Sequence, residues 1–547
     1  MWVVGDGDVC DKPVKEVKSL TFTPELQDAE SADLTQKFAE YVTKAAQFSR
    51  ACEEALTEML VTGIAGTIIM GFMWVIFLWL FAGVIVFVAL TVLVVTLLII
   101  TVVCYVRAGW TPNPDDFFNS TDITPNLGEY NYENLATTDN RTAYAVMAVI
   151  MTILLAIVLI MLAMWRKCIV RCVAIIREST KVFKTIPSMM VWPLVSIVFL
   201  TATYFWAFLV AAYIFYVDED TYAENLDKLQ KAIEEYSSGD AASHLDSDPS
   251  TQKWVLFWVH IFGVLWVVEF IRACTWITMS GAVCWWYFFK EDAEKYEKFP
   301  LLSSCKRVLR YHLGSAAFGA LIIAICQLIR YMLATLDYYT KDVLQENNRI
   351  FELVLKCSQC AMWCLQKTIE FVSYFGFVYI ALNGTSFCAS CKETFKFLLT
   401  PKNAMQTAVN KVVEKLIILI IAWTTPTFTS LICYAWLSGN DEYTADNNPL
   451  YPCIIVWVGS FALAGAIATV FECTIDTIFL CSFRDAAMFN GKYMSEDMKK
   501  GFGISSINEK EMEKMGLSAV QTSADYKKHR EDADKKQAEG TEPTIKA

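Results

Sequence analysis

Residues 59–106 form an uninterrupted apolar segment that contains no Asp, Glu, Lys or Arg. A single helix needs roughly 20 apolar residues to cross a bilayer, so this segment is about twice as long as one span. Hydrocarbon offers the backbone no hydrogen-bond partners, which leaves α-helices and closed β-barrels as the structures that can cross it. Barrel strands alternate apolar and polar side chains over about ten residues, and continuous apolar runs do not fit them. The sequence therefore predicts an all-α polytopic helical membrane bundle.

Nine transmembrane helices are predicted, together with short amphipathic helices. We interpret residues 59–106 as two helices joined by a tight turn near Phe81, Ala82 and Gly83. The stretch before a span at 371–387 is amphipathic, and it fits an interfacial helix, a continuation of the span or a re-entrant segment. The other predicted spans cover residues 143–165, 191–216, 254–287, 313–336, 416–437 and 451–481.

The composition is typical of a membrane protein and argues against a nucleic-acid binder. Of the 547 residues, 55% are hydrophobic and 19% are charged, which is too apolar for an ordinary soluble chain. The 46 Lys and Arg residues are outnumbered by 58 Asp and Glu residues, which gives a net charge of −12. Without a general basic field we expect no nucleic-acid partner, and we expect a lipid bilayer around the chain.

Lysine and arginine in short loops predict the orientation of the chain. Residues 166–184 carry six basic side chains against one Glu, which places this segment in the cytoplasm. Nine spans that end in the cytoplasm place the start of the chain outside. We therefore divide the chain into a non-cytoplasmic segment at 1–58, a transmembrane domain at 59–483, and a charged, partly disordered cytoplasmic tail at 484–547.

Side chains that carry enzymatic or metal chemistry are scarce. The chain has four His, and it contains no Gly-rich phosphate-binding loop and no hydrolase or zinc-protease motif. Cys357, Cys360 and Cys364 have a spacing that zinc could use, but no His accompanies them. Free or acylated thiols are the favoured interpretation. We expect a transport function, no enzymatic activity, no metal and no cofactor.

Four strings of the sequence carry a family resemblance. The longest is FPLLSSCKRVLRYHLGSAAFGALIIAICQLIR at 299–330, and FECTIDTIFLCSFRD at 471–485 lies in the last predicted span. The others are the Trp-Pro-Leu helix that begins at Trp192 and the Cys-rich stretch that ends at Lys392. Taken in their order along the chain, the four strings resemble the choline transporter-like solute carriers over about residues 59–493.

The resemblance implies a secondary transporter that moves choline, or a related small organic cation such as ethanolamine. It also favours the plasma membrane over an organelle membrane as the location.

Two features depart from the family. Its members carry an additional N-terminal span and a large external loop, and Phe375 and Phe377 stand where the family usually has Asn and Tyr. A second hypothesis therefore stays open, in which a transport-inactive member acts as a structural or assembly subunit of a larger membrane complex. Either hypothesis is compatible with a homodimer or with other membrane-complex partners.

A choline site needs aromatic ring faces and a nearby carboxylate, because this permanent cation has no hydrogen on its nitrogen. The spacings of eight and three residues place Trp258, Trp266 and Glu269 on one helical face. The alternatives are that the Trp rings pack against lipid and that Glu269 pairs with Arg272 on its own helix. Two predicted spans supply the candidate substrate-binding residues, which are Trp206, Tyr213, Trp258, Trp266 and Glu269.

Three ionisable residues inside predicted spans are candidates for a proton or cation relay: Glu472, Asp476 and Arg330. A charge inside a span costs roughly 2.5 to 3.5 kcal/mol on insertion scales, so such residues usually face a cavity or a partner. Glu472 and Asp476 are four residues apart and share one helical face, where two like charges raise the proton affinity of one of them. The favoured alternative is a structural cluster, in which we predict that Glu472 or Asp476 neutralises Arg330.

Two glycosylation sequons, at Asn119 and Asn140, lie in an acidic loop that we expect outside. Glycosidase treatment of protein made in a eukaryotic secretory pathway should reduce its apparent mass, and the Asn119→Gln/Asn140→Gln double variant should show no such reduction. A cysteine at Ser120 that reacts only with reagents applied from the cytoplasmic side would overturn the predicted orientation.

Overall fold

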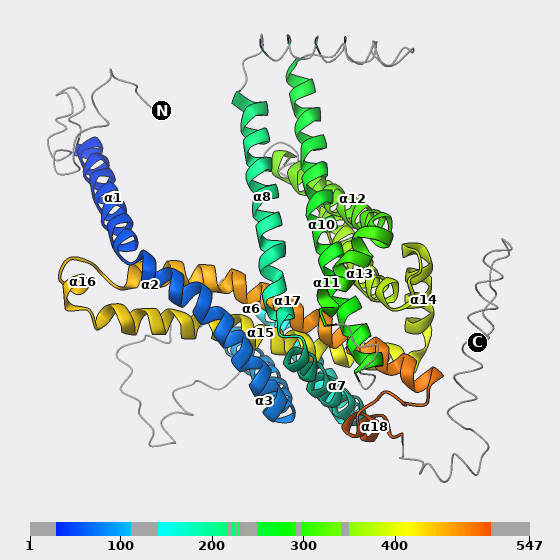
Figure 1. The fold of residues 1–547 in the computed structure, drawn as a ribbon. Helices are drawn as coiled ribbons and strands as arrows, with labels where there is room; N and C mark the ends of the chain where they lie inside the picture. The colour runs from blue at the N-terminus through cyan, green and yellow to red at the C-terminus, as the bar shows by residue number, and fades with distance from the viewer. Residues whose placement is uncertain are drawn as a thin grey trace, which may run out of the picture. The chain divides into compact units, whose positions relative to one another are not determined.

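A computed structural model describes residues 29–110, 141–216, 249–290, 298–340 and 349–504, and single helical residues at 221, 224, 228 and 231. All regular secondary structure in these residues is helical (Figure 1). Seven helices are long and apolar enough to cross a membrane, or eight if one bent pair forms a single span. The predicted all-α polytopic bundle is confirmed, whereas the predicted number of nine spans is not. The sequons at Asn119 and Asn140 lie outside the described residues.

The first apolar segment is one long helix and not the predicted pair. α1 (Ala29–Glu54), α2 (Leu56–Leu60), the π-helical turn η3 (Val61–Gly66) and α3 (Thr67–Ala108) follow one another. Phe81, with φ −121° and ψ 20°, is non-helical but only kinks α3. No proline or polar turn residue stands there to end the helix. The placement of residues 1–58 outside depended on counting two spans here, and it stays a prediction.

The amphipathic stretch before the predicted 371–387 span continues the helix. It belongs to α13 (Arg349–Asn383), which is bent by 110° against α14 (Phe387–Leu399). Gly384 at the bend has φ +69°, a conformation that favours glycine. The remaining helices are α6 (Arg141–Met164), α7 (Arg166–Thr185), α8 (Ser188–Tyr216), α10 (Pro249–Phe289), α11 (Pro300–Arg307), η5 (Val308–His312), α12 (Leu313–Thr340), α15 (Pro401–Ser438), α16 (Asp441–Asp446), α17 (Leu450–Met488) and α18 (Glu496–Phe502).

The chain divides into two compact units, one made of residues 1–67 and 425–461 and the other of residues 68–424 and 462–547. The smaller unit contains α1, α2, α16 and the adjoining parts of α15 and α17. Within it, the Tyr443 hydroxyl donates to the Ala51 carbonyl oxygen at 2.9 Å. Its apolar core consists of Ala55, Cys433, Leu437, Tyr443, Cys453 and Val456.

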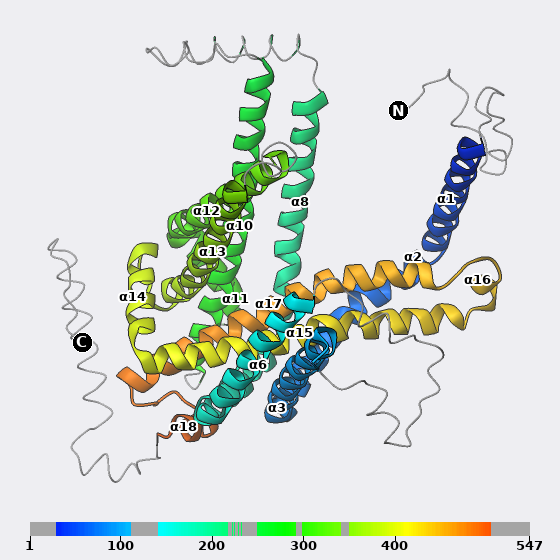
Figure 2. The same ribbon diagram turned by 180° about the vertical axis from the view of Figure 1, so that it is seen from behind.

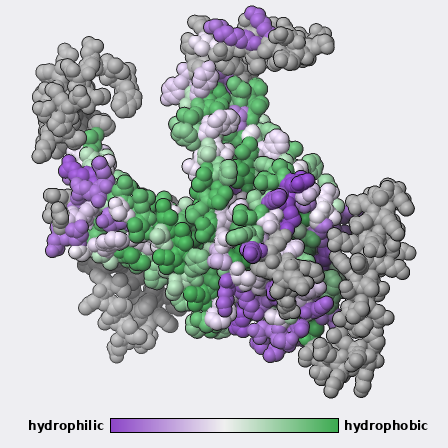
Figure 3. All heavy atoms as spheres, in the orientation of Figure 1, coloured by the Kyte–Doolittle hydropathy of each residue, from purple (hydrophilic) through white to green (hydrophobic). Residues whose placement is uncertain are grey.

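In the larger unit, α10 packs against α8, α12 and α13 and lies between α8 and α12 in both ribbon views (Figures 1 and 2). Gly319 of α12 permits a close approach, because a Cβ at this position would lie 2.5 to 2.8 Å from the rings of Phe377 and Phe387. The outer surface of α8 and α10 is largely apolar (Figure 3). Exposed side chains such as Val198 and Phe208 contribute to it, as expected for helices that face lipid.

Glu178 of α7 links three segments of the larger unit. Its buried carboxylate accepts hydrogen bonds of 2.7 Å from Lys181, from Lys290 after α10 and from the hydroxyl of Ser495 before α18. Burial raises the pKa of the Glu178 carboxyl, but the charge of Lys290 and the three hydrogen bonds outweigh burial and hold the pKa below its usual value. The folded state therefore favours the ionised form of this group.

We expect Glu178→Gln to lower the stability of the protein by roughly 3 kcal/mol at neutral pH, because it removes one partner of a buried ion pair. A lowered pKa contributes stability that is present above the unfolded pKa and is lost as the pH falls through the folded pKa. The wild-type advantage should thus be constant from pH 7 to about pH 5 and shrink below about pH 4. Melting temperatures of the detergent-solubilised proteins measure both effects.

The matched control is Glu393→Gln, which disrupts an exposed ion pair with Lys396. Exposed pairs contribute about 0 to 1 kcal/mol, so this variant should melt close to the wild type. Equal destabilisation by the two substitutions would contradict the linking role of Glu178.

Candidate functional site

A cavity of about 630 Å³ lies among five helices of the larger unit. Its volume falls in the range of roughly 300 to 1,000 Å³ that is typical of small-molecule sites. The lining residues come from α8 (Pro193, Ser196, Ile197, Leu200), α10 (Arg272, Thr275, Trp276, Met279), α13 (Lys367, Glu370, Phe371, Tyr374, Phe375), α15 (Lys411, Lys415) and α17 (Ala462, Ala466, Thr469, Glu472).

Helical periodicity explains why these residues meet. On each helix the lining positions are separated by one, three or four residues, so they share one helical face. The small side chains of Ala462 and Ala466 leave room on the α17 wall. The α8 and α10 walls adjoin each other, and the hydroxyls of Ser196 and Thr275 lie 2.7 Å apart and connect these two helices.

Aromatic rings form one part of the cavity wall. The centroids of Trp276 and Tyr374 are 4.7 Å apart, and those of Phe371 and Phe375 are 4.8 Å apart. The Trp276 indole N–H is buried and has no hydrogen-bond partner among the described residues. Ring faces attract organic cations, and an unpartnered donor in the same wall suits a ligand that also carries an oxygen.

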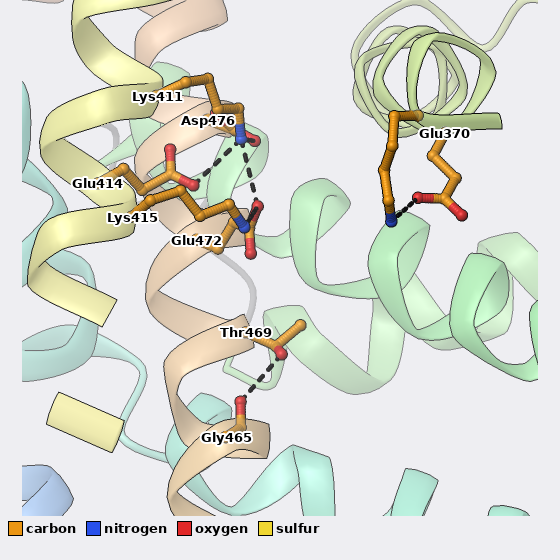
Figure 4. Close-up of polar contacts among 9 residues, drawn as sticks. Glu370, Lys411, Glu414, Lys415, Gly465, Thr469, Glu472 and Asp476 are labelled. Atoms are coloured by element: carbon orange, nitrogen blue, oxygen red, sulfur yellow. Dashed lines mark hydrogen bonds and ion pairs between the residues drawn. The ribbon is translucent and has the colours of Figure 1, made fainter. Parts of the chain in front are cut away.

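Two lysines of α15 and three carboxylates form a charged cluster beside these rings (Figure 4). The Lys411 ammonium lies 2.5 Å from Asp476, 3.1 Å from Glu414 and 3.4 Å from Glu472. Lys415 lies 2.7 Å from Glu472. Oxygens of the three carboxylates lie within 4.8 Å of one another, a separation that a metal ion could bridge. In this structure the Lys411 ammonium contacts all three acids.

The predicted pairing of Arg330 with Glu472 or Asp476 is wrong. Arg330 donates to the Gln366 side-chain oxygen at 2.9 Å, and Gln366 donates to Glu370 at 2.6 Å. Glu370 also accepts from Lys367 at 2.8 Å. The acids of α17 are neutralised by the lysines of α15. Both lysines come before the predicted 416–437 span, but they belong to the same helix because α15 already begins at Pro401.

The four aromatic residues predicted to bind substrate, Trp206, Tyr213, Trp258 and Trp266, which we call the ring stripe, do not line this cavity. Trp206 and Tyr213 are more than half exposed on α8, and Trp206 lies 5.6 Å from the His260 ring. The Trp266 indole donates to the Ala317 carbonyl oxygen at 3.0 Å, and Trp258 is half-buried. None of these four is among the residues that line the cavity. Their role in substrate binding stays a prediction.

Glu269 is buried and adopts the pairing that the sequence analysis gave as the alternative. It accepts from Arg272 at 2.7 Å and from Gln327 at 2.9 Å. Arg272, its partner, lines the cavity. Glu269 thus contributes to the cavity through the position and charge of Arg272.

Sequence reasoning missed the contributions of α13 and α15. Lys367, Glu370, Phe371 and Tyr374 recur at separations of three, one and three residues, which is the signal of one functional helix face. In the sequence, this helix face begins in the amphipathic stretch before the predicted 371–387 span, for which three locations were compatible with the pattern.

Comparison with known proteins places the cavity inside the part of the chain that matches a family model. A family model described as plasma-membrane choline transporter matches residues 149–487, which include every lining residue. The chain is 28% identical over 353 residues to choline transporter-like protein 1 of Mus musculus, covering 64% of this chain and 50% of that protein. It is 26% identical over 475 residues to choline transporter-like protein 2 of Rattus norvegicus, covering 81% and 65%.

A third relative is choline transporter-like protein 4 of Xenopus laevis, at 25% identity over 472 residues, covering 80% of this chain and 65% of that protein. The chain thus spans between half and about two thirds of the length of these relatives.

The observed contacts predict a specific pattern of energetic coupling. Arg330→Leu and Gln366→Leu should be non-additive by roughly 0.5 to 1.5 kcal/mol, because the two side chains share one hydrogen bond. Arg330→Leu and Glu472→Gln, which share no described contact, should be additive within about 0.5 kcal/mol. Denaturation of the three single variants and the two double variants tests both. Strong coupling of Arg330 to Glu472 would restore the pairing that the structure replaces.

Proposed function

The chain belongs to the plasma-membrane choline transporter family, and from this premise we propose that it is a secondary transporter of choline or a related small organic cation such as ethanolamine. We propose that the substrate binds in the cavity among α8, α10, α13, α15 and α17. The observation that carries the proposal is the combination, in one cavity, of four aromatic rings with the carboxylates Glu370 and Glu472.

The chemistry of choline fits this combination. A quaternary ammonium group cannot donate an ordinary hydrogen bond, so its hydration is replaced by ring faces, each contributing on the order of 0.5 to 2 kcal/mol. Trp276, Tyr374, Phe371 and Phe375 offer such faces. The hydroxyl end of choline can bond to polar side chains of the wall such as Ser196 and Thr275. Ethanolamine, which carries N–H donors, would depend more on Glu370 and Glu472.

Gradients can supply the energy for this transport. A membrane potential of 100 mV contributes about 2.3 kcal/mol per monovalent cation, which corresponds to roughly fifty-fold accumulation. We propose the plasma membrane as the location, in line with the description of the family model. A relay of protons or cations through Glu472 and Asp476 is part of the proposal, with Lys411 as their contact instead of Arg330.

The test is uptake of radiolabelled choline and ethanolamine into liposomes that contain the purified protein. Trp276→Ala should weaken choline affinity about five- to thirty-fold, because it removes a ring face and a donor from the cavity. Glu472→Gln should also weaken it, by removing the carboxylate that faces the cavity. Each variant is first shown to be folded by size-exclusion chromatography and thermal denaturation.

The matched comparison is Trp266→Ala, which removes a ring of the predicted stripe outside the cavity. Loss of affinity in Trp266→Ala, with unchanged affinity in Trp276→Ala, would move the site to the stripe. If folded wild-type protein takes up neither cation, the structural or assembly subunit becomes the favoured function.

A further inference from the structure

The cavity already contains a cation that belongs to the protein. The Lys411 ammonium contacts Asp476, Glu414 and Glu472, and it lies 5.5 Å from the centroid of the Phe375 ring. Carboxylates and a ring face are the groups that bind a small organic ammonium ion. Glu472 and Phe375 also line the cavity. Lys411 therefore occupies the kind of environment that the transported cation needs.

The cluster holds more carboxyl groups than ammonium groups. Three carboxylates, Glu414, Glu472 and Asp476, face two ammonium groups. Lys415 contacts Glu472 and is 60% exposed, whereas Lys411 is 19% exposed and is the cation that reaches the two more deeply buried acids. One oxygen of Glu414 and one of Asp476 are buried without a hydrogen-bond partner among the described residues. Lys411 is thus the cation that reaches the buried part of this cluster.

We propose that Lys411 is a tethered competitor of the transported cation, which fills the carboxylate cluster when the cavity is empty and limits the affinity for substrate. The inference rests on the proposed function for the identity of the substrate. A transport site has to bind its ion well enough to capture it and weakly enough to release it. Lys411 meets this requirement because its ammonium returns to the acids when the substrate leaves, so release strands no buried charge.

The test compares binding of choline and tetramethylammonium to purified wild-type protein and to three variants. Lys411→Met removes the competitor and should lower the Kd for both cations at least tenfold, with slower release of choline. Lys411→Met/Glu414→Gln removes one charge of each sign and keeps the formal charge of the cluster. It should still bind at least fivefold more tightly than the wild type, because the position is vacant. It also provides a variant with fewer stranded acids if the single one does not fold.

Lys402→Met is the matched control, since Lys402 is an exposed lysine at the start of the same helix and away from the cavity. It makes the same change in net charge and should leave both Kd values within twofold of the wild type. An equal gain in Lys402→Met would assign the effect to net charge and overturn the proposal.

The outcomes separate this inference from the proposed function. Uptake by the wild type, with unchanged or weaker binding in both Lys411 variants, overturns the competitor role alone. No uptake or binding of choline by the wild type, with tetramethylammonium binding gained in the Lys411 variants, overturns the proposed function and supports the competitor role. If the folded Lys411 variants gain no binding and the wild type shows no uptake, both proposals fail.

Discussion

The larger unit depends on the requirement that each charge within an apolar helical bundle meets a partner, since an isolated charge there is costly. The contacts that satisfy this requirement also connect helices. Lys411 joins α15 to α17 through Asp476. Gln327 joins α12 to α10 through Glu269, and Arg330 joins α12 to α13 through Gln366. The contacts that neutralise these charges therefore also hold together the helices that form the cavity walls.

Apolar packing alone would close such a bundle around a solid core. The walls of this cavity instead combine small residues on α17 with charged residues on α10, α13, α15 and α17. Buried ion pairs contribute little net stability compared with well-packed apolar side chains, although breaking one is strongly destabilising. Their presence around the cavity is consistent with a functional role that apolar residues could not fill.

The sequence predicted the fold class because apolar runs of about 20 residues have few physical solutions. It did not predict the number of spans, because a long apolar run around Phe81 fits either a kinked helix or two helices with a turn. The acids Glu472 and Asp476 were recognised from their spacing. Their partners were not, because Lys411 and Lys415 lie in the N-terminal half of α15, before the apolar window that marks a span.

The choice of rings was harder to predict for a physical reason. Helical periodicity places Trp258, Trp266 and Glu269 on one face, but it does not say whether that face meets lipid, a neighbouring helix or a cavity. Trp276 lies on the same helix, seven residues after Glu269, and it is this ring that lines the cavity. Only the packing of α10 against α8, α12 and α13 distinguishes the two groups of rings.

Under the proposed function, the distribution of charge around the cavity would favour passage of a cation over its retention. Four cationic side chains line the wall, each paired with a carboxylate, and five carboxylates take part in these pairs. An organic cation that entered would thus meet acids that already have cationic partners, and not an unscreened acidic site. Because each acid already has a partner, the cation exchanges one set of ion pairs for another. The free-energy difference between the empty and occupied cavity is then small, as alternating capture and release require.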